Sequence, residues 1–208
     1  MAKTKKPDPR PVEPAGSLDE VRAAAQDCRR CDLWARATQT VFGAGAAHHA
    51  VMFVGEQPGD VEDRAGEPFV GPAGTLLREA LTEAGFDRSD VYLTNAVKHF
   101  KWTPRGKKRL HEKPNRGEVL ACRFWLEQEI AHIEPRAIVA LGATAAQTVL
   151  GPSVRVLRDR GTPIASPLAP LVTLTVHPSS ILRAPDAESR HAARRQFVAD
   201  LRKIRKQL

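Results

Sequence analysis

Short apolar runs alternate along the chain with longer segments in which apolar residues recur at helical spacing. The runs AVMFVG, VYLTN, AIVALG and LVTLTV begin at residues 50, 91, 137 and 171, and each stops at a glycine or a polar residue. Such short runs predict buried strands. Helical spacing occurs from residue 17 up to the CxxC pair at 28–31, and in residues 75–85, 117–133, 143–151 and 191–204. Ser17 and Glu20 form a capping-box pattern, which predicts that the first helix begins there.

The order of these elements indicates an α/β fold. Strands that alternate with helices favour a parallel sheet, and this pattern predicts a three-layer sandwich with a central four-stranded parallel sheet covered on both faces. No linker divides the pattern, so we expect one domain over residues 17–208. Residues 1–16 are rich in lysine and proline without an apolar stretch, which predicts a disordered lead-in rather than a secretory signal.

Composition and charge narrow the class of protein. The 208 residues are 42% hydrophobic and 27% charged, and no run approaches the ~20 apolar residues of a membrane span. We therefore expect a cytoplasmic protein with no membrane role, and a monomer. Lysine and arginine outnumber acidic residues 32 to 24, giving a charge of +8 that favours a polyanionic partner. A basic balance alone is also common in proteins without such a partner.

Polar residues follow all four predicted strands, where a parallel sheet places its chemistry. They are Glu56 and Gln57 after the first strand, Asn95 at the second, Gly142 after the third, and His177 and Ser179 after the fourth. Each has an ordinary structural interpretation when taken alone, since asparagine is frequent in turns and histidine in cores. A cationic stretch from Lys101 to Lys113 contains Pro104 and Gly106, which predict a loop.

Four strings of residues carry a resemblance to a known family. GEQPG (55–59), EPFVGPAG (67–74), TNAVK (94–98) and HPSS (177–180) resemble, in order and context, the iron-sulfur uracil-DNA glycosylases. The resemblance spans roughly residues 20–205. Gln57 within GEQPG, together with the inserted GKKRLH (106–111), is similar to the X-type subgroup, known for crosslinking to uracil in DNA. Leu110 stands where that subgroup usually has isoleucine.

The resemblance implies a pocket for an extruded uracil, built from Gly55, Phe69, Asn95 and His177. A base that has left the stack must be recognised in a pocket. Phe69 would stack on it, which is worth about 1 to 3 kcal/mol. The amide of Asn95 can accept from uracil N3–H and donate to O4, whereas cytosine presents the reverse pattern. His177 would donate to O2, and the loop of residues 55–59 would exclude the methyl group of thymine.

The resemblance also implies a reaction at the sugar. Glu56 and Gln57 would lie beside the anomeric carbon, C1′, and His111 would replace the attacking water of hydrolytic relatives, forming a stable adduct. Glu56 would accept the proton that leaves the imidazole. Arg109 would hold the loop or a phosphate. Further contacts to DNA are expected from Lys107, Lys108 and Ser179, and the cations around His111 would disfavour its protonated form.

Two other functions remain compatible with these residues. The first is a conventional glycosylase that releases uracil by hydrolysis and leaves an abasic site, with His111 only binding phosphate. The second is a non-catalytic, metal-bearing DNA-binding module. Either glycosylase would act on uracil-containing DNA, and the lack of an obvious apolar wedge loop favours single strands.

Three cysteines suggest a bound metal centre. Cys28 and Cys31 form a CxxC pair, Cys122 lies in a predicted helix, and the chain has no fourth cysteine. Spacing alone suits zinc at least as well as iron, and a disulfide is disfavoured without a secretory signal. The resemblance implies a structural [4Fe-4S] cluster whose fourth ligand is His99, at a position where related glycosylases have cysteine.

Overall fold

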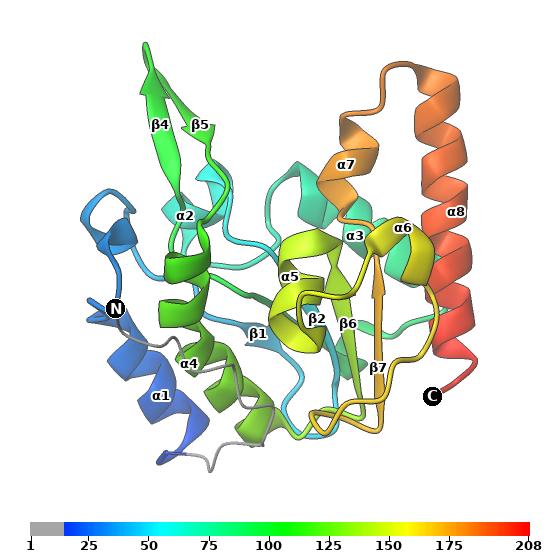
Figure 1. Cartoon of the computed structure of the whole chain (residues 1–208), viewed down its shortest axis with the longest axis horizontal. Helices are drawn as coiled ribbons and strands as arrows, with labels where there is room; N and C mark the ends of the chain where they lie inside the picture. Colours follow the sequence, from blue (N-terminus) through cyan, green and yellow to red (C-terminus); the bar gives the residue numbers. More distant parts are fainter. Residues whose placement is uncertain (1–14) are drawn as a thin grey trace.

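A mostly parallel sheet forms the centre of the molecule (Figure 1). The computed structural model describes residues 15–208, so the expected disorder of residues 1–14 lies outside the described part. The parallel strands β2 (Val51–Gly55), β3 (Val91–Asn95), β6 (Ala137–Leu141) and β7 (Leu171–Thr175) occupy the four predicted runs. A fifth strand, β1 (Ala44–Gly45), pairs antiparallel with β3. The prediction of four strands omitted this edge strand because two residues are too short to show a pattern.

The long helices occupy the predicted segments. They are α1 (Leu18–Gln26), α3 (Pro72–Glu83), α4 (Arg116–Ile133), α5 (Gly142–Leu150) and α8 (Ala187–Arg205). The capping box of Ser17 and Glu20 is confirmed. Five short elements were not predicted, because each is too short for a periodic pattern: α2 (Asp60–Ala65), α6 (Val156–Asp159), α7 (Pro178–Leu182), η1 (Asp32–Ala35) and η2 (Arg88–Asp90). Among residues 15–208, no helix is long and apolar enough to cross a membrane.

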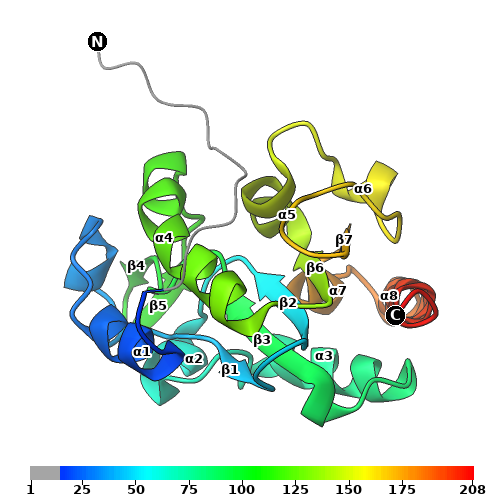
Figure 2. The same cartoon turned by 90° about the horizontal axis from the view of Figure 1, so that it is seen from below.

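Alternate residues of the strands face two separate cores. Val51 and Phe53 pack with residues of α3 and α8, whereas Met52 and Val54 pack with residues of α4 and α5. Side chains of a strand point to opposite faces in turn, so strands covered on both sides are apolar throughout. Figure 2, which looks from below, shows the sheet between these two layers of helices. The predicted three-layer arrangement is confirmed.

The order of the strands determines where a ligand can bind. Across the sheet the order is β1-β3-β2-β6-β7. The chain goes from β2 to β3 on one side and then crosses back to β6 and β7 on the other side, so the strand order reverses between β2 and β6. Ligands of open α/β sheets bind outside the carboxyl ends of the strands at such a reversal. The loops after β2 and β6 flank it.

The cationic stretch is a β-hairpin, and the prediction of a loop there is wrong. Strands β4 (Trp102–Arg105) and β5 (Lys108–His111) pair antiparallel, with Arg105 opposite Lys108. Gly106 has a φ of +58° and begins the two-residue turn between them, a position that favours glycine. Proline is tolerated because both strands of an isolated ribbon are edges. The residues that indicated a loop therefore form the turn and edge of a hairpin that rises above the sheet (Figure 1).

Candidate functional site

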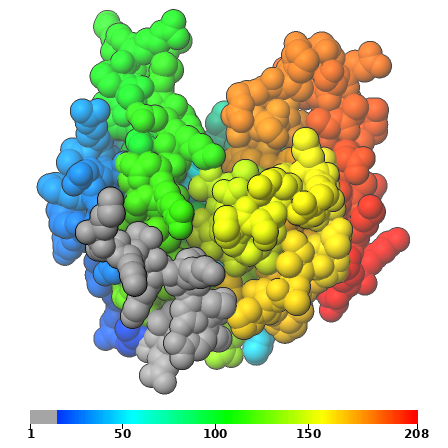
Figure 3. All heavy atoms as spheres, in the orientation of Figure 1, coloured from blue at the N-terminus to red at the C-terminus, as the bar shows by residue number. Residues whose placement is uncertain are grey.

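A cleft of about 1010 Å³ opens at the carboxyl ends of the strands. Figure 3 shows the surface notched between the hairpin, in green, and the segment of α7 and α8, in orange and red. The cleft brings together residues from all four predicted strand ends and from the hairpin. Its lining includes Glu56, Gln57, Phe69, Asn95, His111, Gly142, His177 and Ser179.

Gly55, Phe69 and Asn95 form one compact corner of the cleft. A Cβ atom on Gly55 would lie 2.3 Å from Oδ1 of Asn95 and 2.7 Å from Cζ of Phe69, so both side chains lie directly across this residue. Phe69 has a φ of +57° and is 5% exposed. A strained conformation of this kind persists where the surroundings enforce it, often at functional sites. The corner offers an aromatic face and an amide to a flat polar ring.

His177 is held as a neutral hydrogen-bond donor. Its Nδ1 accepts from the backbone N–H of Ser179 at 3.1 Å, and the hydroxyl of Ser179 lies 2.8 Å from the same atom. Since Nδ1 accepts, the proton of the neutral ring is on Nε2. Burial lowers the pKa of His177 to about 4, with smaller contributions from Arg183 and His111. Ser179 uses its polar atoms to orient His177 and also lines the cleft, and its expected contact with DNA stays a prediction.

Glu56, which follows β2, contacts both α5 and the hairpin. Its Oε2 accepts a short hydrogen bond from the hydroxyl of Thr144 in α5, which follows β6. Its Oε1 lies 3.4 Å from Nε2 of His111. The His111 side chain is 50% exposed, and its ring centroid is 6.2 Å from that of Phe100. A fixed carboxylate therefore faces an imidazole that is open to a ligand in the cleft.

Gln57 holds the base of the hairpin. Its Nε2 donates to the carbonyl oxygens of Lys101 (3.2 Å) and Glu112 (3.1 Å), the residues that flank the two strands, and its Oε1 accepts from the N–H of Lys101 at 3.2 Å. The side chain is buried although it borders the cleft. The amide that was expected beside the sugar is thus engaged by the hairpin backbone.

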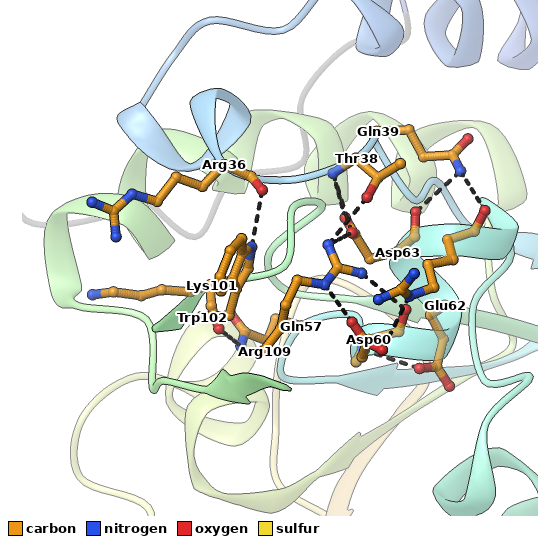
Figure 4. A network of polar contacts seen from close by, with 12 residues as sticks. Arg36, Thr38, Gln39, Gln57, Asp60, Glu62, Asp63, Lys101, Trp102 and Arg109 are labelled. Atoms are coloured by element: carbon orange, nitrogen blue, oxygen red, sulfur yellow. Dashed lines mark hydrogen bonds and ion pairs between the residues drawn. The ribbon is translucent and has the colours of Figure 1, made fainter. Parts of the chain in front are cut away.

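Arg109 fastens the hairpin to α2. Its guanidinium forms a short ion pair with Asp60 and a 2.7 Å ion pair with Asp63, and it donates to Thr38 at 3.1 Å (Figure 4). The same group lies 5.4 Å from the centroid of the Trp102 ring. Only 13% of the Arg109 side chain is exposed. Arg109 was expected either to hold the basic segment in place or to bind a phosphate. The structure shows it holding the basic segment, through Asp60 and Asp63.

The two lysines of the hairpin turn remain exposed. Lys107 and Lys108 lie at the tip of the hairpin, where their ammonium groups face solvent. Cations in this position attract phosphate oxygens without recognising a base.

Two of the three cysteines receive hydrogen bonds in a small core between α1 and α4. Sγ of Cys122 accepts from the N–H of Lys98, and Sγ of Cys28 accepts from Nε1 of Trp125, both at 3.1 Å. Cys31 is partly buried against the same cluster. Burial raises the pKa of Cys122 to about 12 and also raises that of Cys31. A bound cation would be needed to hold these thiols as thiolates.

His99 has one nitrogen available as a ligand. The hydroxyl of Thr40 donates to the carbonyl oxygen of Ala25 at 2.8 Å, so its oxygen must accept from Nε2 of His99, 2.9 Å away. The lone pair of the neutral ring is then on Nδ1. Burial lowers the pKa of His99 to about 4, which keeps the ring neutral. Such an outer partner commonly orients a metal-binding histidine.

The ligands predicted from the sequence do not converge on one point. Among residues 15–208, no group of three or more His, Cys, Asp or Glu side chains is arranged to hold a single metal ion. In a cluster each ligand binds a different iron, so its ligands need not converge as those of one zinc ion do. The donor types fit a thiolate-bound cluster.

Three residues that position the site were not predicted from the sequence. Asp60, Asp63 and Thr144 all contact predicted site residues. The two aspartates follow GEQPG directly, but acidic residues are common in the first turn of any helix, as here in α2. Their contacts with Arg109, which lies 49 and 46 positions further along the chain, could therefore not be recognised from the sequence.

Comparison with known proteins relates the whole arrangement to one family. Residues 42–202 match the family model described as the uracil DNA glycosylase superfamily. The chain is similar to the type-4 uracil-DNA glycosylase of Pyrobaculum aerophilum, at 38% identity over 88% of this chain and 91% of that protein. It is similar to the type-4 uracil-DNA glycosylase of Thermotoga maritima, at 40% identity over 80% and 83%. The type-5 uracil-DNA glycosylase of Pyrobaculum aerophilum is 32% identical over 64% and 62%.

Removing the clamp on Arg109 should loosen the hairpin while the sheet stays intact. Charge-assisted hydrogen bonds of this kind are worth about 1.5–3 kcal/mol, or roughly a tenfold to hundredfold change in opening. We expect Arg109→Lys to accelerate amide hydrogen exchange in residues 102–111 by about that factor and to leave β2 and β6 unchanged. The control is Arg64→Ala, which removes only a more exposed ion pair of Asp60. Unchanged exchange in the Arg109 variant would contradict the clamp.

His177 should titrate far below an ordinary histidine. Its lowered pKa means that the ring stays neutral as the pH falls from 7 to about 5 and gains a proton only near pH 4. Nitrogen NMR of ¹⁵N-histidine-labelled protein should therefore show a midpoint near 4, with the proton on Nε2 above it. A midpoint near 6.5, or a proton on Nδ1, would show that the inferred hydrogen bonds are wrong.

Proposed function

Because the chain belongs to the uracil-DNA glycosylase superfamily, we propose that it excises uracil from DNA and then remains bound to the sugar through His111. The observation that carries this proposal is the position of His111. Its imidazole shares a cleft with Phe69, Asn95 and His177, and its Nε2 lies 3.4 Å from Oε1 of Glu56. A histidine that only bound phosphate would need no carboxylate beside it.

The corner formed by Gly55, Phe69 and Asn95 recognises the base. Phe69 stacks on the extruded uracil, and the amide of Asn95 pairs with N3–H and O4. Cytosine would leave the buried polar groups unpaired, a difference that can reach roughly 10⁴-fold. The glycine is required because any side chain there would collide with the other two residues.

His177 and Glu56 act on the charges that develop as the glycosidic bond breaks. The bond between C1′ and N1 breaks with its electron pair going to uracil, and Nε2–H of neutral His177 donates to O2 of the resulting anion. Glu56 lies on the sugar side, where its carboxylate stabilises the cationic sugar. Fixed groups of this type are effective because they need no reorganisation during the reaction.

One nitrogen of His111 then forms a bond to C1′. The proton on the other nitrogen passes to Glu56, which leaves an uncharged N-alkyl imidazole that is a poor leaving group. Gln57 and Arg109 act as positioning residues, because they fix the hairpin that carries His111. This adduct resembles the behaviour of the X-type subgroup and is proposed here for this chain.

We further propose that single-stranded uracil-containing DNA binds in the notch beside the hairpin, with Lys107 and Lys108 on its phosphates. Their exposure at the tip supports this role.

A [4Fe-4S] cluster held by Cys28, Cys31, Cys122 and His99 is proposed as a structural element. The resemblance, the N–H donors on two of the sulfurs and the available nitrogen of His99 support it. The ligands come from the end of α1, from the segment after β3 and from α4, so the cluster would join these segments behind the hairpin.

A hydrolytic glycosylase is the second candidate, favoured by the similarity to type-4 enzymes. The two functions differ in the product. On a denaturing gel, single-stranded uracil-containing DNA should give a band of the combined mass that survives heat and detergent. Hydrolysis would give free DNA that alkali cleaves.

Substitution of His111 should separate adduct formation from base excision. His111→Ser or His111→Gly should abolish the adduct, and because water can then reach C1′, uracil release should persist. Glu56→Gln should slow adduct formation by roughly 10²-fold or more, the range for loss of a general base. The matched control is Thr103→Ala, which alters an exposed residue of the same hairpin that does not line the cleft. Full adduct formation by either His111 variant, or at the full rate by Glu56→Gln, would contradict the mechanism.

Protein purified without oxygen should contain iron and acid-labile sulfide in equal amounts. Cys122→Ser should lose both, together with visible absorbance, and should form the adduct more slowly because the hairpin loses its support. Circular dichroism would establish that the variant remains folded. Zinc in place of iron would contradict the proposed cluster, and a cluster-free protein that crosslinks normally would contradict its structural role.

A further inference from the structure

A fully buried ion pair lies directly behind the base pocket. Nζ of Lys98 is 2.5 Å from Oε2 of Glu129, and neither side chain is exposed to any extent. Lys98 follows β3 by three residues, and Glu129 lies on α4. Neither residue faces the cleft, and neither has a part in the proposed chemistry.

Every polar atom of this pair is used. The ammonium of Lys98 has three donors, and they reach Glu129, Oγ1 of Thr94 at 2.7 Å and the carbonyl oxygen of Asn95 at 2.8 Å. Glu129 in turn accepts from the hydroxyl of Thr94, from the N–H of Gly43 at 2.7 Å and from the hydroxyl of Tyr92 at 3.3 Å. The network is closed, so its geometry is determined.

Stability alone is a weak explanation for such a pair. Taking two charges out of water costs several kcal/mol per ion, and replacing a buried pair by apolar residues is often neutral or stabilising. In some proteins a buried polar network instead specifies one arrangement of the groups that it binds. The group that it binds here and that faces the cleft is Asn95.

Asn95 lies at the end of its strand, where the regular ladder stops. Opposite Gly55, it is the last residue of β3, and the N–H of Ala96 donates to Gly55 at 2.9 Å. The carbonyl oxygen of Asn95 is bound by Lys98. Rotation of this peptide group would also turn the amide of Asn95, which lies within reach of Gly55 and Phe69. The ammonium therefore fixes the residue that distinguishes uracil from cytosine.

We propose that Lys98 and Glu129 are positioning residues that determine uracil selectivity, by holding Asn95 through its carbonyl oxygen in the orientation that matches uracil. This inference rests on the proposed excision of uracil and adds a selectivity mechanism to it. The side chains act behind the pocket and touch no part of the base.

The test replaces both charges together, because one unpaired buried charge would strongly destabilise the chain. The double variant Lys98→Met/Glu129→Gln keeps the volume and an acceptor for Gly43 but removes the donor to Asn95. We expect its maximum rate of excision from saturating uracil-containing DNA to fall about 100-fold, the effect of a misplacement of about 1 Å. The DNA concentration at half-maximal rate and the denaturant midpoint should change less than twofold. Thr94→Val, which keeps both charges, should show a smaller loss in the same direction.

Tyr92→Phe is the matched control. It removes another buried partner of Glu129 and leaves Lys98 and Asn95 untouched, so its excision rate should equal that of the original protein. The second readout is the side-chain amide of Asn95 in ¹⁵N NMR. It should give one sharp pair of signals in the original protein and the control, and broadened or multiple signals in the double variant.

The outcomes separate the two proposals. If the original protein and Tyr92→Phe release no uracil, the proposed function fails, and the Asn95 signals still report whether Lys98 fixes this residue. If the double variant is folded and keeps both the maximum rate and the sharp Asn95 signals, the positioning role is overturned. Equal losses in the Tyr92→Phe control would likewise overturn it, since they would indicate general damage to the core.

Discussion

The attachment of the β4–β5 hairpin to the sheet is the constraint on which the arrangement of the site depends. A two-stranded ribbon is at best marginally stable in water, and this one has little apolar surface to bury. Its position comes from polar contacts instead, with Arg109 bound by two aspartates and Gln57 bound to the residues that flank both strands at the base of the ribbon. These contacts place His111 beside Glu56. Without these contacts, the position of the His111 imidazole relative to Glu56 would not be defined.

The cleft combines groups that differ in their exposure. Asn95 ends β3, and Glu56 and His177 follow β2 and β7, whose residues are mostly buried, so the close packing of the sheet fixes all three. His111 lies on the hairpin and is half exposed. The buried groups suit recognition of a flat ring, and the half-exposed imidazole stays open to a ligand in the cleft. The reversal of strand order between β2 and β6 creates the space in which the two meet.

Helix α4 supports both parts of the site from behind. It carries Glu129, which holds Lys98 and through it Asn95, and Cys122, whose sulfur accepts from the backbone N–H of the same Lys98. Glu129 and Cys122, which lie on different turns of this one helix, thus both contact Lys98. Lys98 therefore couples the base pocket to the cysteine cluster. The side chain of Lys98 binds Glu129, and its backbone N–H binds Cys122, so both hold the segment after β3 in place.

The sequence by itself determined the parallel α/β fold, its four main strands and five long helices, because hydrophobic periodicity is a local property that survives in any surroundings. It also identified the polar strand ends, since topology alone brings them to one edge of a sheet. The hairpin was not predicted, because proline and glycine occur both in irregular loops and in the turns of hairpins. The tertiary structure decided the partners of Gln57, Arg109 and Lys98. Each of them contacts a residue 31 to 55 positions away in the chain. A local sequence pattern cannot predict such contacts, because they depend on how distant segments pack when the chain folds.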